Sequence, residues 1–198
     1  MSLLIESIKL LDGNFCNLFY HEQRMLRSLH MLFGNQDDLN LEKFLNEVNF
    51  PTRGLFKCRI IYDDASKEIE FIPYVAKPIN SLRIIEHDRI SYEFKYKDRK
   101  TLDRLCDLKK DCDDILIVKR GLVTDSSYSN IVFRKGKEWY TPWSALLNGT
   151  QRQKLIDSDI LIQEEIKTED IRSFDTFKLI NAMLEFESPE IDVKNIVS

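Results

Sequence analysis

Several segments of the chain carry apolar side chains at the spacing of an amphipathic α-helix. In residues 21–34, HEQRMLRSLHMLFG, the apolar positions share roughly one face, and Gly34 is a typical helix stop. In residues 39–48, LNLEKFLNEV, Asn40 stands at the N-cap position. The predicted helices are 21–34, 39–48, 99–111 and 149–159.

Other segments alternate apolar and polar residues, or are apolar for a short run, as strands are. Residues 56–74 contain two such runs around DDAS, and residues 129–142 contain two more that turn at Lys135-Gly136-Lys137. Each pair predicts a β-hairpin. Residues 81–96 predict two strands separated by EHD, and single strands are predicted at 3–11, 114–121 and 176–186.

Strands outnumber helices in this pattern, and many strands are neighbours in sequence. This order predicts an α+β fold with mainly antiparallel sheets and flanking helices, rather than alternating βαβ units. A boundary near residues 95–100 predicts a small N-terminal lobe, 1–96, and a C-terminal lobe, 97–198.

Composition and charge exclude several classes of function. Of the 198 residues, 43% are hydrophobic and 31% charged, and the net charge is -4. This charge gives no general attraction to nucleic acid or to an anionic membrane surface. No apolar run approaches the about 20 residues of a membrane helix. The N-terminal residues lack the features of a secretion signal, so we expect a cytoplasmic protein with reduced cysteines. Three histidines and no C-x-x-C motif predict no metal site.

One segment combines an acid with small hydroxyl residues. Residues 121–133, GLVTDSSYSNIVF, place Asp125 after a strand and a Gly and before three Ser and Asn130. This order also fits a polar loop whose short side chains bond their own backbone.

A Gly149-Thr150 turn precedes the helix predicted at 149–159. The free amides and the dipole of a helix N-terminus favour an anion such as phosphate. Ordinary capping by Asn148 or Thr150 is the alternative interpretation.

Further polar residues stand at the ends of predicted elements. Arg24 lies on the first predicted helix with His21 and Ser28 on flanking turns, and an arginine fork suits a phosphate. Lys95 ends a predicted strand, and the pair Asn181-Ala182 interrupts a late apolar one.

In this order the motifs resemble those of the class IV aminotransferases, the fold-type IV pyridoxal-phosphate enzymes. The matched patterns are H-x-x-R-(L/M)-x-x-S at 21–28, K-x-x-(N/D)-R at 95–99, G-x-(V/I)-(T/S)-(E/D)-x4-N at 121–130, T-P-x(n)-L-x-G-(I/T)-x-R at 141–152 and N-(A/S) at 181–182. The resemblance implies a two-lobed fold similar to D-amino acid aminotransferase, with most of the cofactor site in the C-terminal lobe.

The resemblance also implies pyridoxal 5'-phosphate as the cofactor and a role for single residues. Lys95 corresponds to the catalytic Schiff-base lysine, Asp125 to the carboxylate that faces the pyridine nitrogen, and Arg24 to the phosphate-binding arginine. The remaining expected cofactor contacts are Asn130, Leu147 on a ring face, Gly149, the amides of Thr150 and Gln151, Asn181 and Ala182.

The resemblance leaves alternative interpretations at two positions, Asp125 and Lys95. Most members of the family carry Glu where this chain has Asp125, which is one methylene shorter. The ring would lie closer to the strand, a water would intervene, or the electron sink would be weaker. Lys97 and Lys100 are alternatives to Lys95, because Lys100 precedes TLDRL, which also resembles a family motif. Lys95 keeps the K-x-x-D-R spacing, so we expect the other two to be solvated charges.

The histidines are expected to be surface or capping residues rather than catalysts; they are His21, His30 and His87.

The resemblance leads to three functional hypotheses. The leading one is a lyase similar to 4-amino-4-deoxychorismate lyase, which releases pyruvate and 4-aminobenzoate for folate biosynthesis. The alternative is an aminotransferase of a small amino acid, of the branched-chain or D-amino acid type. The third is a catalytically weak protein that binds pyridoxal phosphate. The expected partners are a small-molecule amino substrate and a second copy of the chain in a homodimer, with no nucleic acid and no membrane.

Overall fold

The computed structural model describes residues 3–35 and 39–198 and divides the chain into two compact units. Unit 1 consists of the described part of Met1–Ala76 together with Phe94–Asp98, and unit 2 consists of Lys77–Glu93 and Arg99–Ser198. The expected boundary after residue 96 falls inside the segment that returns to unit 1, and residues 77–93, expected in the first lobe, belong to unit 2. The division is therefore not a single cut along the sequence.

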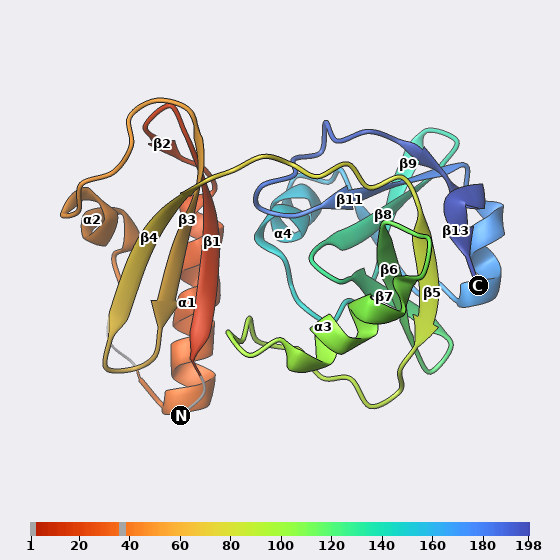
Figure 1. The fold of residues 1–198 in the computed structure, drawn as a ribbon, viewed down its shortest axis with the longest axis horizontal. Coiled ribbons are helices and arrows are strands. Elements are labelled where there is room, and N and C mark those ends of the chain that lie inside the picture. Colours follow the sequence, from red (N-terminus) through yellow and green to blue (C-terminus); the bar gives the residue numbers. More distant parts are fainter. Residues whose placement is uncertain (1–2, 36–38) are drawn as a thin grey trace. The chain divides into compact units, whose positions relative to one another are not determined.

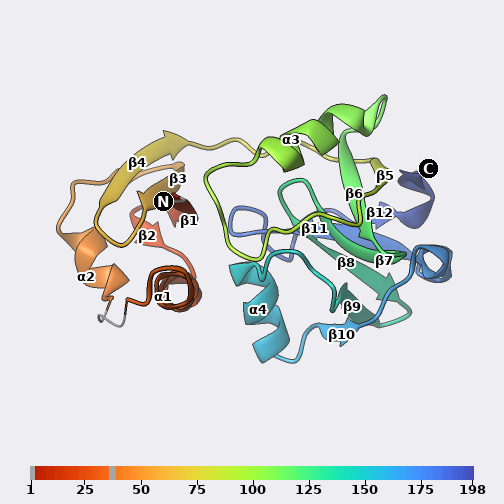
Figure 2. The same ribbon diagram turned by 90° about the horizontal axis from the view of Figure 1, so that it is seen from below.

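Unit 1 is an antiparallel sheet, in the order β2-β1-β3-β4, with helix α1 against one face (Figures 1 and 2). Its elements are β1 (Leu4–Leu11), β2 (Asn14–Phe15), α1 (Leu18–Phe33), α2 (Leu41–Asn46), β3 (Leu55–Tyr62) and β4 (Lys67–Pro73). The pairing of Tyr62 with Lys67 confirms the hairpin predicted around DDAS. Leu4 and Ile8 of β1 and Met25 and Leu29 of α1 share one buried core.

Two predicted helix boundaries in unit 1 are confirmed, the stop at Gly34 and the N-cap at Asn40, whereas α1 begins earlier than predicted and α2 ends earlier. Gly34 follows α1 with φ 70°, and its N–H donates to the carbonyls of His30 and Leu29, as in a left-handed C-cap. The Oδ1 of Asn40 accepts a hydrogen bond from the Lys43 N–H at 2.7 Å, which caps α2.

Unit 2 is a larger mixed sheet in the order β10-β9-β8-β7-β6-β5-β13, with β11 paired to β8 (Figure 1). Its strands are β5 (Leu82–Glu86), β6 (Asp114–Lys119), β7 (Leu122–Ser126), β8 (Asn130–Lys135), β9 (Glu138–Pro142), β10 (Ile162–Glu164), β11 (Thr176–Ile180), β12 (Ile191–Asp192) and β13 (Ile196–Val197). Its helices are α3 (Lys100–Cys106), α4 (Thr150–Asp157) and the 3-10 turns η1 (Asp107–Lys109), η2 (Thr168–Ser173) and η3 (Val193–Asn195). Most strand pairs in both units are antiparallel, which confirms the α+β class.

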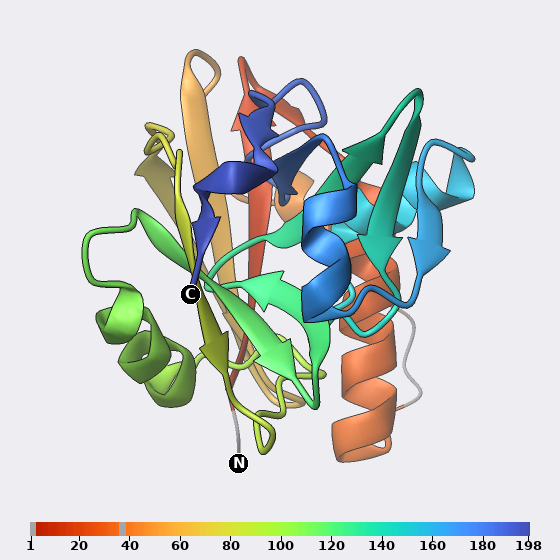
Figure 3. The same ribbon diagram turned by 90° about the vertical axis from the view of Figure 1, so that its right-hand side faces the viewer.

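Strands β8 and β11 are buried on both faces. On one face, Phe133 of β8 packs in a core that includes Ile171 of η2, the mid-blue coil of Figure 3. On the other face, Val132 and Ile180 pack with Leu155 of α4. The N-terminus of α4 is thereby held beside the first residues of β8.

The second strand predicted within residues 81–96 is wrong. After β5, the segment to Tyr96 forms one isolated bridge, between Tyr96 and Leu4. The apolar alternation arises because Phe94 and Tyr96 pack against the core of unit 1. The helix predicted at 99–111 is also shorter, since α3 ends at Cys106 and Leu108 is exposed.

Across residues 3–35 and 39–198, none of the helices has the length and apolar character needed to cross a membrane. All four cysteines are free thiols.

Candidate active site

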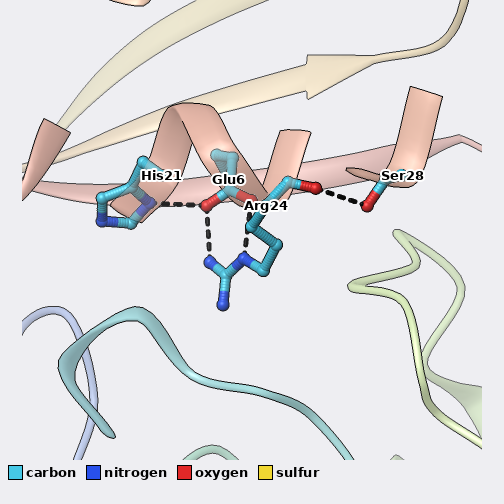
Figure 4. A network of polar contacts seen from close by, with 4 residues as sticks. All are labelled: Glu6, His21, Arg24 and Ser28. Carbon is cyan, nitrogen blue, oxygen red and sulfur yellow. Dashed lines mark hydrogen bonds and ion pairs between the residues drawn. The ribbon is translucent and has the colours of Figure 1, made fainter. Parts of the chain in front are cut away.

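A buried charged cluster lies between β1 and α1 in unit 1 (Figure 4). Side chains alternate along β1, so Glu6 points to the same face as Leu4 and Ile8, and its side chain is 0% exposed. On α1, His21 and Arg24 are three positions apart and therefore share the face that meets Glu6.

Glu6 accepts hydrogen bonds from both residues of α1. Its Oε2 lies 2.6 Å from His21 Nδ1, its Oε1 accepts from Arg24 Nε at 2.9 Å, and its Oε2 also accepts from Arg24 Nη2. Burial alone would raise the pKa of Glu6, but the charge of Arg24 and the hydrogen bonds from His21 and Arg24 lower that pKa to about 2. Glu6 is therefore an anion at neutral pH.

His21 is fully buried, so the expectation of a surface or capping residue was wrong for it. Burial lowers its pKa, the charges of Arg24 and Lys95 lower it further, and Glu6 opposes the shift. An ionised carboxylate only accepts hydrogen bonds, so the neutral imidazole carries its proton on Nδ1 and donates it to Glu6. His30 is exposed, as expected.

Lys95 lies in the segment that returns to unit 1. Its carbonyl accepts a hydrogen bond from the Ile5 N–H at 2.9 Å, and Phe94 and Tyr96 on either side pack against the core of unit 1. The backbone of Lys95 is thus fixed beside Ile5, which precedes Glu6 in β1. Lys95 is half-buried, whereas the two alternative lysines at 97 and 100 are exposed.

A second buried carboxylate, Asp125, lies at the end of β7 in unit 2 and is 6% exposed. It pairs across the sheet with Asn130, the first residue of β8, whose Nδ2 donates to Asp125 Oδ1 at 2.8 Å. The Leu146 and Leu147 N–H groups donate to Asp125 Oδ2 at 2.8 and 3.0 Å. Burial raises the pKa of Asp125 to about 6, although these donors and the Arg152 charge oppose the shift.

Gly149 is required by a close approach rather than by its backbone angle. A Cβ at this position would lie 2.0 Å from Asn130 Oδ1. Asn130 also donates to the Leu147 carbonyl at 2.9 Å, so one side chain joins β8, Asp125 and the loop before α4. Thr150 and Gln151, in the first turn of α4, are both buried.

Arg152 holds α4 against the strands beside it. Its Nε donates to Thr141 Oγ1 at 3.1 Å, and its Nη2 donates to the Pro142 carbonyl at 2.8 Å and to Gln163 Oε1 at 3.1 Å. Thr141, Pro142 and Arg152, which belong to the same sequence motif, are therefore in direct contact and join β9 to α4.

Asn181 orders the turn that follows β11. Its Oδ1 accepts from the N–H groups of residues 183 and 184, both at 2.8 Å, and its Nδ2 donates to Ser129 Oγ at 2.9 Å. Ala182 follows it and is half-buried. Asn181 thereby ties this turn to the loop between Asp125 and Asn130.

Several residues of these clusters were not predicted as site residues, among them His21, Arg152, Glu6 and Arg99. Glu6 occupies an inward-facing position of an otherwise apolar strand face, and that was the available signal. Arg99, part of a matched motif, donates to the Ser127 carbonyl at 2.6 Å and stacks 4.0 Å from the Tyr128 ring centre. It anchors the loop between β7 and β8.

The residues in these two units suit pyridoxal phosphate chemically. An aldehyde needs an amine, which Lys95 has, and a phosphate needs cations or helix amides, which Arg24 and the first turn of α4 have. A pyridine nitrogen that keeps its proton needs a carboxylate. Asp125 suits this role because the three hydrogen-bond donors described above for it are neutral.

Comparison with known proteins decides the family. The model of the class IV amino-transferase family matches residues 81–187. The chain belongs to this family.

A protein from Haemophilus influenzae described only as uncharacterized is 36% identical over 183 residues, which cover 91% of this chain and 97% of that protein. A crystal structure from Haemophilus somnus, provisionally assigned as a 4-amino-4-deoxychorismate lyase, is 34% identical with a TM-score of 0.88, and the match covers 94% of this chain and 98% of that one. The branched-chain amino acid aminotransferase from Escherichia coli shares the fold, with a TM-score of 0.75 at 12% identity, over 98% of this chain and 76% of that one. This chain is thus a class IV, fold-type IV enzyme, a lyase or an aminotransferase, and its cofactor is pyridoxal phosphate.

Proposed function

We propose that this protein is a 4-amino-4-deoxychorismate lyase, which converts its substrate to 4-aminobenzoate and pyruvate and so serves folate biosynthesis. The observation that carries the proposal is the similarity to the Haemophilus somnus structure over 94% of this chain and 98% of that one.

The reaction breaks the ether C–O bond to the pyruvate-forming group and removes a proton from the ring carbon, which makes the ring aromatic. It needs no second substrate. When bound, pyridoxal phosphate supplies the electron sink. Lys95 carries the cofactor through Nζ and moves the proton as general base and then general acid. The resemblance assigns Asp125 to the proton of the ring nitrogen, Arg24 of unit 1 to the phosphate, and the amides of Thr150 and Gln151 of unit 2 to an anion at the start of α4.

The neighbours of Asp125 support its role despite its shorter side chain. Asn130 and the amides of Leu146 and Leu147 fix both carboxylate oxygens. A carboxylate has about four acceptor positions, so three donors leave one for a ring N–H. Leu147 donates to Asp125 and Gly149 lies against Asn130. The resemblance to the family assigns Leu147 to a face of the cofactor ring and Gly149 to the turn before α4.

An aminotransferase acting on a small amino acid is the alternative, because the matched family model is that of class IV amino-transferases. The two reactions differ in what they consume. An aminotransferase needs an added keto acid and converts its bound cofactor to the amine form when it meets an amino donor, whereas the lyase releases pyruvate from aminodeoxychorismate alone.

The decisive experiment is therefore pyruvate release from aminodeoxychorismate with no keto acid present. We expect turnover by the wild type and a loss of more than about 10³-fold in Lys95→Ala, because the amine is both attachment point and base. Borohydride reduction followed by mass spectrometry should place the cofactor on Lys95. Lys97→Ala and Lys100→Ala are matched controls and should keep both the label and the rate. Turnover only with an added keto acid would favour the aminotransferase, and cofactor binding without either reaction would favour the weak binding protein.

The homodimer expected from the resemblance and the cytoplasmic location expected from the sequence both stay predictions. Light scattering of the purified, cofactor-loaded protein tests the first.

A further inference from the structure

Arg24 is held from behind by a fully buried carboxylate, and this arrangement gives Glu6 a task. We propose that Glu6 is a positioning residue that sets the plane of the Arg24 guanidinium so that its outer edge meets the cofactor phosphate. The inference rests on the proposed role of Arg24 as the phosphate-binding arginine.

Two hydrogen bonds to one carboxylate fix the rotation of a planar guanidinium. Glu6 takes the edge of Arg24 formed by Nε and Nη2. Figure 4 shows the third nitrogen of Arg24 pointing away from Glu6 and from β1. The Arg24 side chain is 13% exposed. The edge opposite Glu6 is therefore the one oriented for an anion.

Glu6 is itself held by two elements. Glu6 lies opposite Ile60 of β3. On the other edge of β1, its neighbour Ile5 donates a hydrogen bond to the Lys95 carbonyl. The Glu6 carboxylate is shared with His21, whose Nδ1 lies 2.6 Å from Oε2. The Ser28 hydroxyl donates to the Arg24 carbonyl at 2.8 Å within α1. The position of the guanidinium is thus determined by the sheet as well as by its own helix.

The charge of Glu6 argues against a purely electrostatic role. An anion beside Arg24 opposes the binding of a second anion, because like charges repel. If only charge mattered, removal of the Glu6 charge would tighten phosphate binding. If position matters, the same change weakens it, because the guanidinium loses its fixed plane. The two roles therefore predict opposite signs.

The test compares two ligands, pyridoxal phosphate and pyridoxal, which lacks the phosphate. Glu6→Gln keeps the shape of the side chain and removes the charge. We expect this variant to bind pyridoxal phosphate about 10-fold or more weakly, as loss of a supporting hydrogen-bond partner does elsewhere. Its affinity for pyridoxal should change by less than about twofold, since that ligand does not use Arg24. Both affinities are measured by absorbance titration of the apo protein.

A double-mutant cycle shows whether Glu6 acts through Arg24. Arg24→Lys keeps the charge but cannot form the two-nitrogen contact, so it should also lower the phosphate preference. In Glu6→Gln/Arg24→Lys, the loss should be no greater than in the weaker-binding single variant. Leu45→Ala, at a buried core position of unit 1, is the matched control for destabilisation and should lower Tm without changing the preference. Glu6→Asp, which keeps the charge on a shorter side chain, should give an intermediate loss and serves if Glu6→Gln does not fold.

The outcomes separate this inference from the proposed function. If Arg24→Lys lowers the preference for pyridoxal phosphate and Glu6→Gln leaves it unchanged or increases it, the positioning role of Glu6 is wrong. If Arg24→Lys leaves the preference unchanged, the phosphate-binding role of Arg24 fails first.

Discussion

The two buried carboxylates, Glu6 in unit 1 and Asp125 in unit 2, have pKa values that are shifted in opposite directions. Each accepts three described hydrogen bonds, and each is nearly or fully buried. The charge of Arg24 helps to lower the pKa of Glu6 to about 2, whereas burial raises that of Asp125 to about 6, since its three donors are neutral. The comparison teaches that burial alone does not decide the charge of a carboxylate; its partners do.

This difference fits two different tasks. Glu6 already has a cation from its own unit, so it suits a structural ion pair that orients Arg24. Asp125 accepts from neutral groups that fix its direction without compensating its charge. Such a carboxylate gains most from an added cation, and a protonated pyridine nitrogen is one.

Removing the cation of the Glu6 cluster should give the largest effect. Arg24→Met leaves a buried carboxylate with its charge uncompensated, and breaking a buried pair costs about 3–5 kcal/mol of unfolding free energy. Chemical denaturation of the apo protein at pH 7 measures the loss. Arg27→Met, an exposed position on the same helix, is the control and should change stability by less than about 0.5 kcal/mol. Equal losses in both variants would show that Glu6 does not depend on Arg24.

The loss of stability at acid pH should depend on Glu6, with an effect nearly as large as that of Arg24→Met. The pKa of Glu6 is lowered from 4.5 to about 2, so the unfolded chain binds more protons in this window. Its contribution is present above pH 4.5 and is lost as pH falls through about 2, which amounts to about 3 kcal/mol. Over this pH range, the free energy of unfolding measured by denaturation should change less for Glu6→Gln than for the wild type. The same pH dependence of stability in both proteins would contradict the lowered pKa of Glu6.

The network of Asp125 should respond to a single methyl group with a smaller loss. In Gly149→Ala the new Cβ would meet Asn130 Oδ1 at 2.0 Å, so the Asn130 side chain must shift, which disturbs its hydrogen bond to Asp125. We expect a loss of about 1–3 kcal/mol, the cost of a disturbed buried hydrogen bond, measured by denaturation. The same change in an Asn130→Ala background should cost clearly less. An equal cost in both backgrounds would mean that Gly149 is needed for another reason.

Much of the fold was predictable because local patterns and caps agree with tertiary packing. Gly34 and Asn40 end and begin helices as their residue types predict, and the apolar run at 115–118 lies in a buried strand. The strand expected near Phe94 was wrong because its apolar residues pack into unit 1, a long-range contact that a local pattern does not contain.

The candidate site was predictable where motif residues also bond to one another, as Asp125 and Asn130 do. Glu6 was missed because its place on the apolar face of the strand does not by itself identify partners for the charge. Only the position of α1 shows that it meets His21 and Arg24. The boundary between the units was not predictable in detail, since Phe94–Asp98 returns to unit 1 through hydrogen bonds to Leu3 and to Ile5 of β1.

The most direct test of the account is a carboxyl ¹³C NMR titration of Asp125 with and without pyridoxal phosphate, with Asp125→Asn to assign its signal. We expect a midpoint near pH 6 in the apo protein. Once the cofactor is bound, the midpoint should be clearly lower, because a protonated ring nitrogen stabilises the ionised carboxylate. An Asp125 midpoint that is the same with and without the cofactor would contradict the account.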